Sequence, residues 1–196
     1  MQQLLLATRN SHKTQEFAEI LGDGFIVHDL AESEVPPIEE TGLTFEANAI
    51  LKGVETSKHF PGLVVADDSG LEVDALGGAP GIYSARYAGE HATNEERIAK
   101  LLAALRGAAT SAARSARFRC ALALAQSGAV LGTFDGVVEG VIVSQPRGTG
   151  GFGYDPIFQP HGFDQTFGEL GAAEKNEISH RARAIRSLLT ALRAAP

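Results

Sequence analysis

The chain has 196 residues and a formal net charge of −7, with 44% hydrophobic and 21% charged residues, values typical of a globular protein with a sizeable core. Its acidic balance and the lack of a basic stripe argue against a nucleic-acid partner, and no apolar run reaches the roughly 18 residues that would span a membrane. A single cysteine, Cys120, excludes an intramolecular disulfide; with no secretory signal recognisable at the N-terminus, we expect a cytoplasmic protein.

The first half of the chain alternates extended and helical patterns. The predicted elements are a strand over Gln3–Ala7, a helix over His12–Gly22, a strand over 25–30, an irregular loop over 31–43, a helix from Thr44 to Lys58 and a buried strand over Leu63–Ala66. Thr44 is a good N-cap for its helix. The predicted buried face of this helix carries Ala47, Ile50, Leu51 and Val54.

The second half is richer in strands. The predicted elements are a helix from Asn94 to Arg106, a low-complexity connection over 107–115, strands over Arg117–Ala125, Ala129–Phe134 and Val137–Ser144, a glycine-rich loop over Gly148–Gly153, a short extended piece over Tyr154–Gln159 and a last helix from Asn176 or Ser179. Glycine-containing turns between the three strands indicate an antiparallel meander. Cys120 falls in one of these strands, where core packing is favoured over a nucleophilic role. The order of elements predicts a mixed α/β fold.

A polar segment, Thr8–Thr14, joins the first strand to the first helix. Backbone N–H groups at a helix N-terminus, with Lys13 nearby, make a candidate phosphate site. The segment lacks the two glycines of a Walker P-loop. By itself it equally fits a polar turn that caps the helix.

Two acidic segments are candidate metal sites. Glu39 and Glu40 lie in the irregular loop, and Asn48 and Lys52 share a face of the following helix. A loop carboxylate can ligate Mg²⁺ while the lysine faces phosphates, although a solvated acidic loop suits Glu39 better. Asp67 and Asp68 follow a buried strand and point to opposite faces, so we expect one to hold metal or activate water and the other to anchor a turn.

Two later segments are candidate base-binding sites. In Gly148–Pro156 the backbone can approach a ligand closely, Phe152 and Tyr154 can stack on a base, and Asp155 can accept from a ring N–H. The alternative is a tight turn with a core aromatic. His180 and Arg181 lie in the first turn of the last helix, where cations are disfavoured, so they either read a base carbonyl or form a solvated helix end.

Together these segments resemble the inosine/xanthosine triphosphate pyrophosphatase family. The resemblance runs from Leu5 to about Leu192 and is carried by the stretches ETGLTFEANAILK, ADDSGLEVDALGGAPGIYSARYAG, GTGGFGYDPIF and EKNEISHRARA. It implies a single ITPase-like domain over 1–196, with an elongated mixed β-sheet flanked by helices and two lobes around a central cleft. It further implies a homodimer and a Mg²⁺-dependent hydrolase that converts ITP, dITP and XTP to the monophosphate and pyrophosphate, and so removes deaminated purines from the nucleotide pool.

The resemblance also implies roles for individual residues. Asp68 is the proton acceptor and, with Glu40, carries the metal. The substrate-binding residues are Thr8, Asn10, Lys13, Lys52, Ser69, Phe152, Gly153, Tyr154, Asp155, Lys175, His180 and Arg181. Arg9 departs from the family pattern, which has a small residue there, and its side chain either turns away from the phosphates or adds a charge to them.

Three other functions fit parts of the pattern. A pyrophosphatase for a modified pyrimidine nucleotide is disfavoured by the pair His180 and Arg181, which suits a purine 6-oxo group. A nucleotide-binding module without activity would not need a metal-ligating carboxylate. A purely structural domain would not need Asp, Lys and Gly gathered at predicted strand ends.

Overall fold

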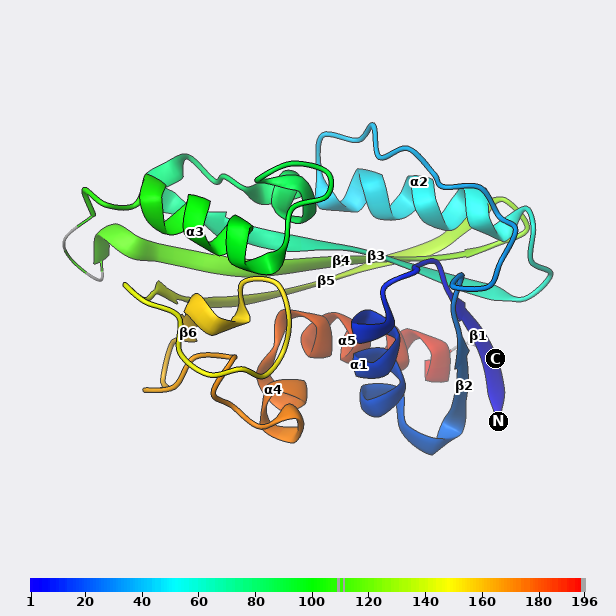
Figure 1. The fold of residues 1–196 in the computed structure, drawn as a ribbon. Coiled ribbons are helices and arrows are strands. Elements are labelled where there is room, and N and C mark those ends of the chain that lie inside the picture. Colours follow the sequence, from blue (N-terminus) through cyan, green and yellow to red (C-terminus); the bar gives the residue numbers. More distant parts are fainter. Residues whose placement is uncertain (109, 111, 195–196) are drawn as a thin grey trace. The chain divides into compact units, whose positions relative to one another are not determined.

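The computed structural model describes residues 1–108, 110 and 112–194, and within them it has a mixed α/β architecture (Figure 1). Its strands are β1 (Gln2–Leu6), β2 (Phe25–His28), β3 (Leu63–Val73), β4 (Ser115–Gln126), β5 (Ala129–Ile142) and β6 (Phe158–Pro160). Its α-helices are α1 (Ser11–Leu21), α2 (Phe45–Ser57), α3 (Asn94–Ala104), α4 (Ala172–Ile178) and α5 (His180–Ala194). The strands form one sheet in the order β2-β1-β3-β4-β5-β6, which confirms the predicted mixed sheet flanked by helices.

The chain forms two compact units. The first unit contains Met1–Asp68, Cys120–Gly136 and the segment from His180 onward, and the second unit contains Ser69–Arg119 and Val137–Ser179. Strands β3, β4 and β5 each contribute residues to both units. A single domain with a central cleft between two lobes stays a prediction.

In the first unit, β1 is parallel to both β2 and β3 and is buried on both faces. Leu4 and Leu6 belong to one core cluster and Leu5 to another on the opposite face. Helices α1 and α5 cover the Leu4 side, and α2 lies on the other side of the sheet (Figure 1). Continuous apolar runs are the expected pattern for parallel strands covered on both faces.

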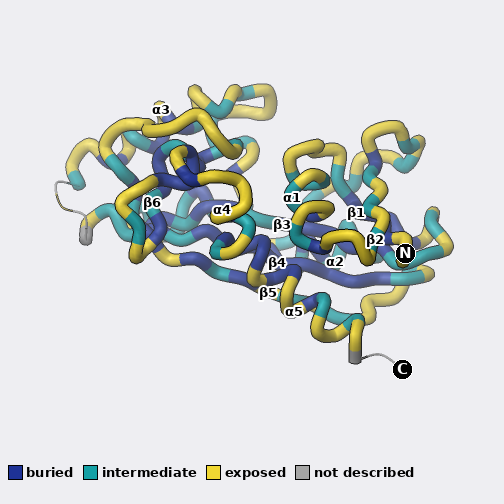
Figure 2. The backbone as a smooth tube through the Cα atoms, turned by 90° about the horizontal axis from the view of Figure 1, so that it is seen from below, coloured by how far each residue is buried: buried dark blue, intermediate teal, exposed yellow. Residues whose placement is uncertain are grey.

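Strand β3 extends beyond the predicted end at Ala66 and runs through Asp67 and Asp68 to Val73. Figure 2 shows its residues as largely buried. The prediction was wrong because two adjacent acids suggested the end of a strand. Here burial with cationic partners lets both carboxylates remain inside the sheet.

Strand β5 is a single element where the sequence predicted two strands and a turn at Gly136. A Cβ at Gly136 would lie 2.1 Å from the carbonyl oxygen of His180 and 2.6 Å from the backbone nitrogen of Ala184. Gly136 therefore allows α5 to pack closely against β5, because glycine has no Cβ atom to clash with the helix backbone. The turn between β4 and β5 lies at Ser127 and Gly128, both with positive φ, as a two-residue hairpin turn requires.

Helix α2 begins after Thr44, whose side chain accepts a hydrogen bond from the backbone N–H of Ala47 at 3.1 Å, so the predicted N-cap is confirmed. The predicted buried face is wrong, since Ala47, Ile50, Leu51 and Val54 are only partly buried. The buried positions are Phe45, Asn48, Ala49, Gly53, Thr56 and Ser57. Small residues let the helix approach β4 closely: a Cβ at Gly53 would lie 3.5 Å from the carbonyl oxygen of Ala123.

The second unit is built on an aromatic core. Phe118 of β4 packs against Phe158 of β6 with ring centroids 4.7 Å apart, and Phe167 stacks beside them. Helix α3 adds Ile98 and Leu101 to this core. The N-cap of α3 is Thr93, one residue before the predicted Asn94, because Thr93 and Glu96 form a reciprocal capping box.

Two helices replace the single last helix that the sequence predicted. Helix α4 ends at Ile178, Ser179 is extended, and α5 begins at His180. The alternative start at Asn176 is wrong, since Asn176 lies inside α4. The predicted extended piece over Tyr154–Gln159 is a 3₁₀ turn followed by the short β6. No helix in the described part of the chain is long and apolar enough to cross a membrane.

Candidate active site

The segment between β1 and α1 is shaped by its own side chains. Asn10 caps α1 by accepting from the backbone N–H of His12 at 3.0 Å, and the hydroxyl oxygen of Thr8 accepts from the backbone N–H of Asn10 at 3.1 Å. The capped turn is therefore confirmed. Phosphate binding by Thr8 and Asn10 stays a prediction, and both residues retain exposed surface.

Parallel pairing of β1 with β3 brings this segment to the two aspartates. Leu6 is in register with Val65, so the residues that follow β1 lie beside Asp67. The Lys13 ammonium forms an ion pair with Oδ1 of Asp67 and lies 3.4 Å from the Asp67 carbonyl oxygen. Ligands of open parallel sheets commonly bind at the carboxyl ends of strands, which is where Lys13 lies.

A second cluster forms around Lys52 of α2. Its Nζ lies 2.7 Å from Oε1 of Glu40, 3.0 Å from Oδ1 of Asp68 and 3.0 Å from the carbonyl oxygen of Asp67. Asn48 supports this cluster: its amide nitrogen donates to Oδ2 of Asp68 at 3.2 Å, and its oxygen accepts from the backbone N–H of Gly42 at 2.8 Å. The loop carboxylate and the strand carboxylate thus converge on one cation.

The pKa values of this cluster reflect opposing effects. Burial raises the pKa of Asp68, the neighbouring Glu40 raises it further, and Lys52 opposes both. Burial alone would lower the pKa of Lys52, but Asp68 and Glu40 outweigh it and raise that pKa. A carboxylate whose pKa is raised is a better proton acceptor than an ordinary one, provided that it is ionised.

Glu40 and Asp68 fit a magnesium ion by their chemistry and placement. Both present carboxylate oxygens to the same positive group, and Mg²⁺ is usually bound by one or two carboxylates together with waters and substrate phosphates. Within the described residues there is no cluster of three or more His, Cys, Asp or Glu side chains that could hold a metal.

Asp67, whose side chain is fully buried, is the centre of the other charge cluster. Its Oδ2 accepts from Nε of Arg181 at 2.9 Å and from the thiol of Cys120 at 3.2 Å. Arg181 also pairs with Glu16 of α1. Burial would raise the pKa of Asp67, but Arg181 and Lys13 hold it well below its usual value.

His180 and Arg181 are buried at the start of α5, so the alternative of a solvated helix end is wrong. The side chain of Arg181 is 1% exposed, and its guanidinium is neutralised by two carboxylates. The positive end of the helix dipole disfavours a cation, and the two carboxylates offset this cost for Arg181. Base recognition by either residue stays a prediction.

In the second unit, the predicted base-binding residues Phe152, Asp155 and Lys175 come together. Lys175 Nζ lies 2.6 Å from Oδ2 of Asp155 and 5.0 Å from the centre of the Phe152 ring. The same Asp155 oxygen accepts from the backbone N–H of Phe152 at 2.8 Å. Asp155 therefore shapes the glycine-rich loop, and a Cβ at Gly151 would lie 2.0 Å from this oxygen.

The other residues predicted for this part of the site differ in exposure. Tyr154 is buried in the aromatic core, and its hydroxyl donates to the carbonyl oxygen of Ser84 at 3.0 Å, which matches the alternative of a core aromatic. Burial raises the pKa of Tyr154. Phe152, Gly153 and Ser69 are partly buried, and nucleotide contacts for all four residues stay predictions.

Sequence reasoning missed Glu16 and left Arg9 open. Glu16 lies three residues after Lys13 on α1, so helical spacing could have indicated that it faces the same cluster. Arg9 donates to the carbonyl oxygens of Ser33 and Val35 in the loop after β2. Its guanidinium is thus directed to this loop, and its position relative to the phosphates stays a prediction.

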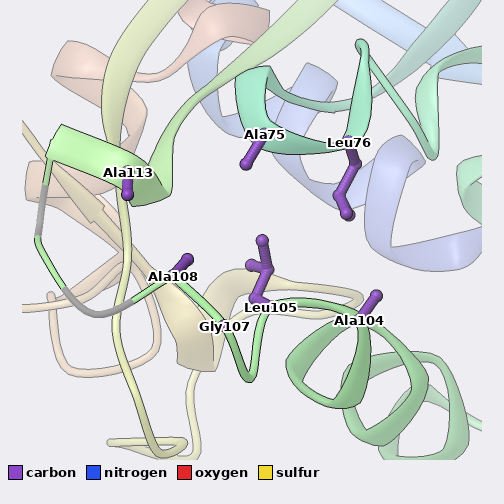
Figure 3. Close-up of a pocket in the computed structure, with 7 residues that line it drawn as sticks. All are labelled: Ala75, Leu76, Ala104, Leu105, Gly107, Ala108 and Ala113. Atoms are coloured by element: carbon purple, nitrogen blue, oxygen red, sulfur yellow. The ribbon is translucent and has the colours of Figure 1, made fainter.

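A cavity of about 530 Å³ in the second unit does not suit a nucleotide. Figure 3 shows its lining residues, which are Ala75, Leu76, Ala104, Leu105, Gly107, Ala108 and Ala113. None of these side chains carries a charge or a hydrogen-bond donor. Phosphate groups need both, so the charged clusters on β3 are the better candidate site.

Comparisons with known proteins identify the family of this chain. Residues 4–191 match the Ham1 family. A dITP/XTP pyrophosphatase of Bacillus subtilis (strain 168) is 50% identical over 196 residues, covering 99% of this chain and 98% of the relative. One from Bacillus licheniformis is 49% identical over 190 residues, covering 96% of each. The structure of a HAM1 protein from Coxiella burnetii has a TM-score of 0.88 at 46% identity and covers 100% of both chains.

Proposed function

This chain belongs to the Ham1 family, and on that premise we propose that it hydrolyses dITP, ITP and XTP to the monophosphate and pyrophosphate. The observation that carries the proposal is the convergence of Lys13, Lys52, Glu40 and Asp68 around one stretch of β3. Two ammonium groups and two carboxylates beside the carboxyl end of β1 suit a phosphate group and a metal ion together. A binding module would need only the ammonium groups.

The charge of the substrate explains why both lysines are needed. A triphosphate carries about four negative charges, which must be offset before water can attack phosphorus. Lys13 and Lys52 are the two cations of the cluster, and both donate to the carbonyl oxygen of Asp67, so they are held close to one another. We assign them to the phosphates, with Thr8 and Asn10 in the loop beside Lys13.

We assign Asp68 as the proton acceptor for the attacking water. Its Oδ2 accepts from Asn48 and its Oδ1 from Lys52, so its orientation is fixed by two donors. From this position it accepts the proton of the attacking water. The water oxygen then bonds to the α-phosphorus, the bond from that phosphorus to the pyrophosphate oxygen breaks, and the monophosphate and pyrophosphate result. Asn48 and Lys52 keep the carboxylate from rotating away during this step.

Magnesium is part of the proposal. Glu40 and Asp68 are the residues that would hold it, and when bound it supplies positive charge that the leaving pyrophosphate requires. The support is that their oxygens lie 2.7 and 3.0 Å from one ammonium, so they can share one cation.

We assign the base to the residues at the start of α5 and around the glycine-rich loop. His180 and Arg181 are donors suited to the 6-oxo group of hypoxanthine and xanthine. Adenine has an amino group there, which would leave buried donors unpaired at a cost of about 1–3 kcal/mol. Phe152, Asp155 and Lys175 would frame the base, with Ser69, Gly153 and Tyr154 beside them.

A homodimer in the cytoplasm completes the proposal and rests on the family resemblance. Sedimentation equilibrium tests the assembly, since a mass of one chain, 20.6 kDa, at all protein concentrations would contradict the dimer.

The decisive experiment for the function measures pyrophosphate release from inosine, xanthosine, guanosine and adenosine triphosphates, with Mg²⁺ and with a chelator. We expect rapid release from the first two, slow release from the others and none with the chelator. Binding without release would favour a nucleotide-binding module. Release that is insensitive to the chelator would contradict the magnesium assignment, and equal release from all four would contradict the assignment of the base.

A further inference from the structure

Asp67 joins two parts of the site that the sequence treats as separate. One carboxylate oxygen, Oδ1, pairs with Lys13, and the other, Oδ2, accepts from Arg181 at 2.9 Å. Lys13 is assigned to the phosphates and Arg181 to the base. A single carboxylate therefore lies between the two ends of the proposed ligand site.

Burial makes this arrangement sensitive to change. The side chains of Asp67 and Arg181 are 0% and 1% exposed, whereas Lys13 is 16% exposed. Solvent screens buried charges only weakly, so a change at one partner of Asp67 is felt at the other. A ligand can reach Lys13 from solvent, whereas the guanidinium of Arg181 is held in place by Asp67 and Glu16.

We propose that Asp67 is a positioning residue that couples recognition of the base at Arg181 to binding of the phosphates by Lys13. The inference rests on the proposed function for the identity of the ligand and does not need Asp67 to touch it. When Arg181 holds Asp67, the charge of the carboxylate is shared and Lys13 is available to phosphate. When Arg181 is displaced or weakened, Asp67 is neutralised by Lys13 alone and withdraws it from the phosphates.

A phosphate probe without a base separates this coupling from direct contact. Inorganic tripolyphosphate carries the phosphate charge of the substrate but has no base that Arg181 could bind. We expect Arg181→Lys to weaken the binding of tripolyphosphate by about fivefold or more, which is a usual size for coupling between two sites. Isothermal titration calorimetry without metal measures this affinity. Arg183→Lys is the matched control, because it makes the same change on an exposed residue of the same helix.

The coupling must disappear when Asp67 is neutralised. In an Asp67→Asn background, Arg181→Lys is expected to leave tripolyphosphate affinity unchanged. The variant retains the backbone carbonyl that both lysines contact, so it isolates the carboxylate. Asp67→Asn alone is expected to lower the ratio of kcat/KM for inosine over adenosine triphosphate, since Arg181 loses its fixed position.

If Asp67→Asn does not fold, Lys13→Gln replaces it as the background, because the effect of Arg181→Lys should then have no route to phosphate. Equal effects of Arg181→Lys with and without Asp67 or Lys13 would overturn the proposal, as would no effect in the parent protein. The tripolyphosphate measurements use no nucleotide, so failure of the coupling is distinguishable from failure of the proposed function, which is judged by pyrophosphate release from the parent protein.

Discussion

Asp67 and Asp68 are neighbours in β3, yet their carboxylates bind different cations: Asp67 pairs with Lys13 and Arg181, and Asp68 pairs with Lys52. The alternation of side chains along a strand separates them, as the sequence indicated. The expected division of labour was partly wrong, because Asp67 anchors cationic side chains rather than a turn. Asp68 is left as the acid that shares a cation with Glu40.

Asp68→Asn is therefore expected to lower the rate of pyrophosphate release by about 100-fold or more, because an amide cannot accept the proton. The change removes charge and little volume, so the circular dichroism spectrum and the urea midpoint should change little. Asp135→Asn, at an exposed position of β5, is the control for charge alone. Activity of Asp68→Asn at the level of the control would refute the assignment of Asp68.

Lys13→Ala is expected to raise KM for inosine, xanthosine and adenosine triphosphates by a similar factor, about tenfold, since it removes a contact to phosphate that all three share. Steady-state kinetics with each nucleotide measure the three ratios. A change confined to the inosine substrate would show that Lys13 reads the base.

Removing one partner of the buried pair of Lys175 and Asp155 is expected to cost far more stability than breaking an exposed pair. Their side chains are 6% and 4% exposed, so Lys175→Met leaves a buried carboxylate without its cation and should lower the free energy of unfolding by about 3–5 kcal/mol. Lys58→Met breaks a pair whose side chains are 49% and 45% exposed and should cost below about 1 kcal/mol. Urea denaturation compares the two, and equal losses would mean that burial of the pair is not what matters.

Gly136→Ala should separate β5 from the start of α5. The added methyl group would meet the backbone of His180 and Ala184, which cannot move without shifting the helix, so we expect a loss of about 2 kcal/mol or more. Gly132→Ala in the same strand meets the ring of Phe134 at 3.2 Å, and a side chain can yield. Thermal unfolding of both variants decides the point, and the expectation fails if Gly132→Ala is the more harmful.

Cys120 is expected to be unreactive in the folded protein. Burial raises the pKa of its thiol well above the usual value, and the nearby Asp67 raises it further. Because the thiolate is the reactive form, a rise from about pH 7 to about pH 9 should speed alkylation of the urea-unfolded chain and leave the folded protein almost unlabelled. Rapid labelling of the folded protein at the higher pH would show that Cys120 is accessible and ionised.

Much of the fold followed from local patterns. Thr44 was identified as an N-cap because capping depends on one side chain and the next three residues. Helix α2 was rotated wrongly because its buried face is set by close approach to β4 at Gly53, which favours small residues over the larger Ile50 and Leu51. Gly136 was taken for a turn because its partner, α5, lies far along the chain.

The candidate site was predictable by residue type but not by partnership. Residue types and the family resemblance together indicated that Lys13, Glu40, Lys52 and Asp68 carry charge for phosphate and metal. It did not indicate that Arg181 is paired with Asp67 and Glu16, since those residues are 114 and 165 positions away. Such contacts depend on which strands become neighbours, which no local pattern contains.

The composition of the two units has a consequence for biosynthesis. The segments Ser69–Arg119 and Val137–Ser179 are translated before α5, so the first unit is the last to be completed. The core of the first unit includes Ala184, Ile185 and Leu188 of α5, and Asp67 receives its guanidinium partner from the same helix. Until α5 is in place, the nascent chain exposes the Asp67 carboxylate and the apolar residues that α5 will cover. Ribosome-bound chains that stop before α5 should therefore depend on chaperones for the first unit.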